Sequence, residues 1–144
     1  MYVTKEDVRK VCSELGMRDW SQLTSPIVTL EEAEIIQKKV GGEALEISVE
    51  AFQQGLEVEL EHGVGFSDAN VTNNHPILTG KIVLAHLKES LDYYLRLEIA
   101  ELEGDMLKAL LAGDHNKLAQ KYKKLLLARL NLCQYEVSLM NQGD

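Results

Sequence analysis

The apolar side chains of residues 115–141 constrain the fold most, because they recur in alternating steps of four and three. This spacing is typical of a helix whose apolar seam faces another helix. Asp114 is placed to cap the helix, which we expect to run to about Asn141. At 1.5 Å per residue it would span about 40 Å, longer than a compact domain of this size is wide. The seam consists of Leu126, Leu130, Cys133, Val137 and Met140.

The same helix carries a second apolar stripe on a neighbouring face, made of Leu125, Leu132 and Leu139. A helix that is apolar over two faces is either deeply buried or covered by another chain. We therefore expect a homodimer that forms through residues 115–141. Two alternatives stay open: a monomer in which both stripes meet other helices, and a scaffold that binds a different protein through this helix.

The rest of the chain also follows helical periodicity, and no segment shows the sustained alternation of a strand. Thr4 and Thr29 each stand three residues before an acidic residue, which is the pattern of a capping box. Ser48 is a suitable N-cap for the next helix. Between the first two helices, residues 17–28 are expected to form a loop with one buried aromatic side chain, Trp20. The predicted helices are 5–15, 30–39, 48–63, 76–103, 105–112 and 115–141.

These features predict an all-α fold, a small helical bundle with a long C-terminal helix. The length of 144 residues and mass of 16.2 kDa suit a single domain over residues 1–144. Within it we distinguish N-terminal helices (1–47), core motif helices (48–103) and a C-terminal helical extension (104–144).

Composition excludes several classes of partner. A net charge of −8 argues against nucleic acid, which is bound through clustered Lys and Arg. No apolar run approaches the roughly 18 residues of a membrane span, and the N-terminus lacks a secretory signal. Cys12 and Cys133 lie among apolar neighbours, and we expect both to be buried free thiols in a reducing cytoplasm.

Two helices place ionisable groups where a small domain needs hydrocarbon. On helix 48–63, Glu59 falls within the apolar stripe and His62 falls at its edge, whereas Glu57 and Glu61 point to solvent. On helix 76–103, His86 lies in the middle of the inward face and Glu89 on its border. Each helix thus carries a carboxylate and an imidazole one turn apart. The loop between the helices favours antiparallel packing, which would bring the two pairs together.

Three interpretations of this cluster compete. The first is a buried hydrogen-bonded pair of Glu59 with His86 that joins two helices, since a buried charge must be paired. The second is a divalent-metal site for Fe, Mn or Zn, with Glu59, His62 and His86 as ligands and Glu89 as a fourth. The third is acid–base catalysis by Glu59 and His86. Ferritin-like metal sites use more inward carboxylates than this chain offers. No sequence motif of an enzyme is present, so we expect a non-enzymatic protein.

Other polar residues are expected to have local roles. His75, next to Pro76, is expected to cap the following helix, and His115 to be exposed. Asp92 and Arg96, four residues apart, are expected to pair.

Two stretches, GLEVELEHG (55–63) and NVTNNHPILTGKIVLAHLKESLDYYLRLE (70–98), carry a resemblance to a known family. They resemble a family of small prokaryotic domains of unknown function. In its members an E-H-G helix end precedes a T-N-V-T-N-D-D-P-like loop and a T-G-K-I-x-x-A-H-L-x-E-x-x-D-Y-Y-x-R-L-like helix. The matching positions are Glu59, Glu61, His62, Gly63, Asn70, Thr72, Asn73, Pro76, Gly80, Lys81, His86, Glu89, Asp92, Tyr93, Tyr94 and Arg96.

The resemblance covers residues 48–98 and implies that residues 52–98 are the working unit. The chain departs from the pattern at Asn74 and His75, where the family favours two aspartates. Region 17–47 reads as an insertion and region 104–144 as an extension. The resemblance implies no activity, substrate or cofactor.

Overall fold

A computed structural model describes residues 2–143 and divides the chain between Glu89 and Ser90 into two compact units. Over that range it contains six α-helices, two short 3-10 helices and no strand, and the C-terminal helix is the longest. The predicted all-α fold with a long C-terminal helix is therefore confirmed.

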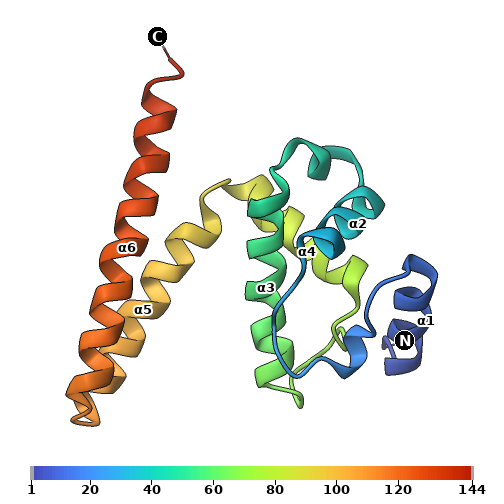
Figure 1. Cartoon of the computed structure of the whole chain (residues 1–144), viewed down its shortest axis with the longest axis horizontal. Coiled ribbons are helices and arrows are strands. Elements are labelled where there is room, and N and C mark those ends of the chain that lie inside the picture. The colour runs from blue at the N-terminus through green and yellow to red at the C-terminus, as the bar shows by residue number, and fades with distance from the viewer. Residues whose placement is uncertain (1, 144) are drawn as a thin grey trace. The chain divides into compact units, whose positions relative to one another are not determined.

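The first unit holds four α-helices whose starts follow the predicted caps. Thr4 and Thr29 both form complete capping boxes, and the Ser48 hydroxyl accepts a hydrogen bond from the backbone of the third helix. Each cap satisfies backbone N–H groups that a helix start otherwise leaves without partners. The elements are α1 (Lys5–Leu15), η1 (Trp20–Gln22), α2 (Leu30–Val40), η2 (Gly42–Glu46), α3 (Val49–Gly65) and α4 (Pro76–Glu89), shown in Figure 1.

Helices α2, α3 and α4 pack against one another around an apolar core. Its largest fully buried side chains include Trp20, Ile36, Phe52 and Leu56. Gly80 lets α4 approach α2 closely, because a Cβ there would lie only 2.7 Å from Cγ2 of Ile36. Full burial of such a side chain contributes about 1.5–3 kcal/mol, so the burial of these residues stabilises the unit.

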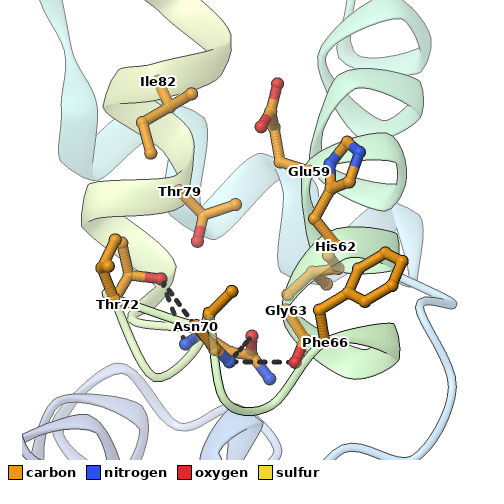
Figure 2. A pocket seen from close by; sticks show the side chains of 12 residues that line it. Glu59, His62, Gly63, Phe66, Asn70, Thr72, Thr79 and Ile82 are labelled. Carbon is orange, nitrogen blue, oxygen red and sulfur yellow. Dashed lines mark hydrogen bonds between the residues drawn. The ribbon is translucent and has the colours of Figure 1, made fainter.

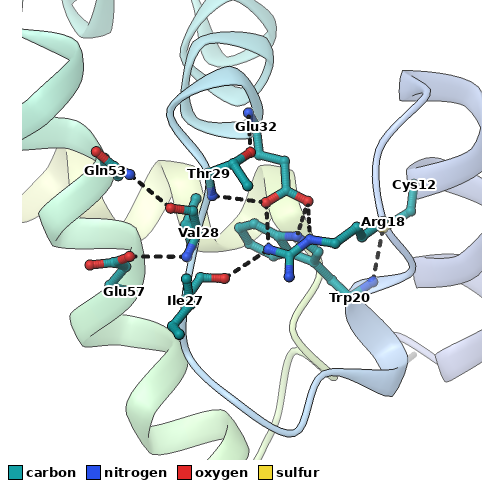
Figure 3. Close-up of polar contacts among 9 residues, drawn as sticks. All are labelled: Cys12, Arg18, Trp20, Ile27, Val28, Thr29, Glu32, Gln53 and Glu57. Atoms are coloured by element: carbon teal, nitrogen blue, oxygen red, sulfur yellow. Dashed lines mark hydrogen bonds and ion pairs between the residues drawn. The ribbon is translucent and has the colours of Figure 1, made fainter.

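A buried ion pair fixes the loop between α1 and α2 (Figure 3). The Glu32 side chain is only 5% exposed, and the Arg18 guanidinium donates to both of its oxygens, at 2.8 and 2.6 Å. Trp20 Nε1 donates to the same carboxylate at 3.3 Å. Burial alone would raise the pKa of Glu32, but the hydrogen bonds from Arg18, Thr29 and Trp20 outweigh it and lower the pKa. The carboxylate thus stays charged and joins the loop to α2.

The same loop crosses α3 and changes the environment of Glu57. The Val28 backbone N–H donates to Glu57 Oε1 at 3.0 Å, and Gln53 Nε2 donates to the Val28 carbonyl at 2.7 Å (Figure 3). The prediction that Glu57 points to solvent is therefore wrong. A polar face of α3 is covered by backbone from a distant segment, which helix periodicity alone does not reveal.

The second unit is a helical hairpin of α5 (Tyr93–Leu111) and α6 (His115–Met140). Gly113 adopts a left-handed φ of 70° in the short connection, and Asp114 caps α6 by accepting from the Lys117 backbone at 2.9 Å. The two helices lie side by side in Figure 1. Their buried contact consists of Leu102, Leu125 and Ala128, with Ile99 and Met106 packed around it.

Two predicted helix bounds are wrong. The expected helix 76–103 breaks at residues 90–92, where Asp92 accepts from the Ser90 hydroxyl and from Arg96 Nε. The pKa of Asp92 is lowered, and the hydrogen bond from Ser90 lowers it more than the contact with Arg96 does. The expected pairing of Asp92 with Arg96 is confirmed at 2.8 Å. Gly104 was expected to end a helix, yet α5 continues through it to Leu111.

Candidate functional site

The loop between α3 and α4 is held by its own amides (Figure 2). Asn70 Nδ2 donates to the Gly63 carbonyl at 3.1 Å and to Asn74 Oδ1 at 2.8 Å. The Asn74 backbone N–H donates to the Thr72 hydroxyl at 3.2 Å. Asn73 and Asn74 have left-handed φ angles of 49° and 63°, which asparagine tolerates better than most residues. The loop is therefore an ordered structure, as its composition indicates.

Two of these asparagines also tie the loop to the N-terminal segment. Asn73 Nδ2 donates to the Val3 carbonyl at 2.7 Å, and the buried Asn74 donates through Nδ2 to the Trp20 carbonyl at 3.3 Å. An aspartate at position 74 could not donate this second bond, because an ionised carboxylate only accepts. The asparagine that departs from the family pattern thus has a structural role in this chain.

His75 caps α4, as predicted. Its Nδ1 accepts from the Leu78 backbone N–H at 3.4 Å, which requires a neutral ring. Burial lowers the pKa of His75 and so favours the neutral form.

A pocket of about 270 Å³ lies between α3, this loop and α4 (Figure 2). Apolar side chains form most of its wall, and Glu59 and His62 are its ionisable members. In Figure 2, Glu59 and His62 project from α3, opposite Thr79 and Ile82 of α4. The lining residues are Glu59, Leu60, His62, Gly63, Phe66, Ala69, Asn70, Val71, Thr72, Asn74, Thr79 and Ile82.

Glu59 of α3 and His86 of α4 come together beside this pocket. Glu59 Oε1 lies 3.5 Å from His86 Nε2, and their side chains are 18% and 31% exposed. We call this contact the Glu59–His86 pair. It joins the two helices that carry the family-like motifs, as the first interpretation of the sequence expects, but the pair is partly exposed rather than buried.

The other two predicted site residues are placed less centrally. His62 is exposed and lines the pocket with Glu59, whereas Glu89 is exposed at the last position of α4 and does not line it. Across residues 2–143, no three His, Cys, Asp or Glu side chains are grouped so that they could hold a metal ion. The metal set of Glu59, His62, His86 and Glu89 stays a prediction.

A second candidate surface lies on α6 and is apolar. We call it the α6 seam: Leu126, Leu130, Cys133, Val137 and Met140. Its four large members are between 48% and 77% exposed. Cys133 is exposed too, so the prediction that its thiol is buried is wrong for the single chain. The same prediction is confirmed for Cys12, which is buried. In the described part of α6, Leu125 of the neighbouring stripe and Ala128 pack against α5, whereas Leu139 of that stripe is 47% exposed. No helix in the described part of the chain is both long and apolar enough to cross a membrane.

Sequence reasoning missed the asparagine network and the Arg18–Glu32 pair. Both join segments that are distant in sequence, so no local spacing marks them. The one usable signal was the run of Asn and Thr residues at 70–74, which predicted an ordered loop without predicting its partners.

Comparison with protein families agrees with part of the resemblance. A family model described as "Protein of unknown function (DUF5661)" matches residues 8–103. No curated protein and no solved structure matches the chain. The match begins within α1, so region 17–47 is part of the family domain rather than an insertion, and it ends within α5. Because the match covers well over half of its residues, the chain belongs to the DUF5661 family of proteins of unknown function.

Proposed function

We propose that this protein is a non-enzymatic interaction protein that forms a homodimer through the α6 seam. The observation that carries the proposal is the exposure of that seam. Isolated apolar side chains on a surface are ordinary, but a contiguous apolar stripe on one helix marks an interaction site. The heptad-like spacing favours another helix as the partner, and a second copy of this chain supplies one.

The hairpin itself supports an interaction role. Two helices joined by a short connection bury one face each, and here the buried contact centres on Leu102, Leu125 and Ala128. The second face of α6 keeps about half of each large side chain in contact with water. Covering it would contribute roughly 1 kcal/mol for each half-exposed leucine, given 1.5–3 kcal/mol for full burial. A dimer covers both copies of the seam, which doubles this gain.

In the first unit we assign a structural role to the Glu59–His86 pair. It connects α3 to α4 next to the asparagine loop, and its partners are close enough for a charge-assisted contact whenever His86 is protonated. Within residues 2–143, every buried side-chain N or O has a hydrogen-bond partner. These satisfied hydrogen bonds are typical of a stable, well-packed fold. The cytoplasmic location expected from the sequence stays a prediction.

Sedimentation equilibrium of the Leu130→Lys variant tests the proposal. Placing a lysine in the covered seam removes apolar contact in both copies and buries two charges, at a cost of about 3 kcal/mol or more. The dimer dissociation constant should rise at least 100-fold. The matched control is Asn131→Lys, which adds the same charge to an exposed neighbouring position outside the seam. Equal behaviour of the two variants would contradict the proposal.

A second candidate function is divalent-metal binding, which the placement of Glu59 favours. Its carboxylate lies 3.5 Å from one imidazole and shares a pocket wall with a second, His62. In this proposal Glu59, His62 and His86 would form a 2-His-1-carboxylate set for Fe, Mn or Zn, with Glu89 as a further ligand. Titration of the chelator-treated protein with Zn²⁺ and Mn²⁺ tests this: stoichiometric binding that Glu59→Gln abolishes supports it, and no binding rejects it.

A further inference from the structure

We infer that the two copies pack with their α6 helices antiparallel. This inference rests on the proposed function and adds the orientation and register of the interface. Two features of α6 carry it: the position of the seam relative to α5, and the charges beside the seam.

The seam lies beside the stripe of α6 that packs on α5. Leu126 follows the buried Leu125 by one residue, which is a rotation of about 100° around the helix. Cys133 stands in the same relation to Leu132. A second α6 can therefore pack on the seam while α5 stays in place. With two neighbouring apolar stripes, α6 can contact two helices at once, its own α5 and the α6 of a second copy.

Charge distinguishes the antiparallel from the parallel arrangement. Lys123 continues the seam one heptad before Leu130. In a parallel pair Lys123 would face the partner's Lys123 across the seam, and this like-charge contact is unfavourable. In an antiparallel pair centred near residues 131–132, Lys123 instead lies opposite the partner's Met140.

The antiparallel arrangement also pairs opposite charges along one edge of the seam. Arg129 and Glu136 lie seven residues apart on the edge nearer α5, where Glu136 already contacts Arg96 at 3.6 Å. Antiparallel packing brings Arg129 alongside Glu136 of the partner subunit, and the twofold symmetry makes this contact twice. In the core of the same register, Leu126 packs against the partner's Val137, and Leu130 against the partner's Cys133.

Cysteine crosslinking of the full-length protein tests the inference. In a Cys133→Ser background, the variants are Leu126→Cys, Val137→Cys and the two together, each oxidised with copper phenanthroline and run on a non-reducing gel. Positions 126 and 137 are 11 residues apart, about 16 Å along a helix, whereas a disulfide joins Cα atoms no more than about 7 Å apart. Antiparallel packing in this register therefore predicts covalent dimer for the double variant and none for either single variant.

The remaining outcomes separate the two proposals. If the single variants crosslink, the helices are parallel, and the inference fails while the proposed dimer stands. If sedimentation shows a dimer and neither single nor double variants crosslink, the register is wrong and the inference fails again. If the wild-type protein sediments as a monomer at every concentration, the proposed function itself is rejected.

Discussion

Gly63 is the position where one added methyl group should disturb the first unit most. A Cβ there would lie 2.1 Å from Asn74 Oδ1 and 3.0 Å from Asn70 Nδ2. Asn74 is buried and bonds to the Trp20 carbonyl, so it cannot simply move into solvent. The Gly63→Ala variant must therefore displace the asparagine network or shift the end of α3.

The expected size follows from opposing contributions. Alanine in a helix stabilises by up to about 1 kcal/mol relative to glycine. Against this, displacement of Asn74 breaks two side-chain hydrogen bonds, each contributing about 1 kcal/mol, and leaves buried polar groups unpaired at a further 1–3 kcal/mol. We expect a net loss of about 2–4 kcal/mol in the free energy of unfolding.

Urea unfolding followed by circular dichroism measures this loss. The matched control is Gly65→Ala, two residues later in α3, where an added Cβ has no neighbour within 4 Å. The control should equal wild type or exceed it by a few tenths of a kcal/mol. If Gly63→Ala is as stable as Gly65→Ala, the loop packing does not stabilise the unit and the reasoning is refuted.

Three further predictions concern the rest of the chain. Gly104→Ala should stabilise the hairpin by up to about 1 kcal/mol, because no atom lies within 4 Å of the added methyl; a lower urea midpoint than wild type would contradict this. The pKa of Glu32 is lowered in the folded state. The Glu32 carboxylate therefore contributes its full stabilisation above pH 4.5, the ordinary pKa of a glutamate, and this stabilisation is lost as the pH falls below that value. Arg18→Gln should weaken that acid dependence, measured as the melting temperature between pH 7 and pH 3. Glu59→Gln should lower the melting temperature slightly, since its pair is partly exposed and contributes at most about 1 kcal/mol, and a curve identical to wild type would argue against a structural role.

The helix starts were predictable because their signals are local. Thr4, Thr29, Ser48 and Asp114 each act through a backbone N–H within three residues, so the sequence alone specifies the contact. The proximity of Glu59 and His86 also followed from helix periodicity, which placed both on the facing sides of their helices, although the structure leaves the pair partly exposed.

The break between α4 and α5 and the continuity of α5 were not predictable in the same way. No glycine or proline marks residues 90–92, where the turn depends on hydrogen bonds from Ser90 and Arg96 to Asp92. Gly104, a usual stop signal, is tolerated because Leu102 and Met106 on either side pack against α6. At Gly104 tertiary contacts outweigh local propensity, whereas the break at residues 90–92 involves local hydrogen bonds that helix periodicity does not reveal.

The candidate site shows the same limit. Helix periodicity placed Glu59 and His86 correctly, but it could not show that Val28 covers Glu57. It also could not show that Asn73 and Asn74 reach back to the N-terminal segment. These contacts join residues that are between 29 and 70 positions apart, so only the folded chain reveals them.

The most direct test of the central claim is the mass of the wild-type protein in solution. Sedimentation equilibrium over a wide concentration range measures it without any substitution. A homodimer through the α6 seam predicts a mass of twice 16.2 kDa that falls toward 16.2 kDa only on dilution. A mass of 16.2 kDa at every concentration would contradict the proposal that the α6 seam joins two copies of this chain.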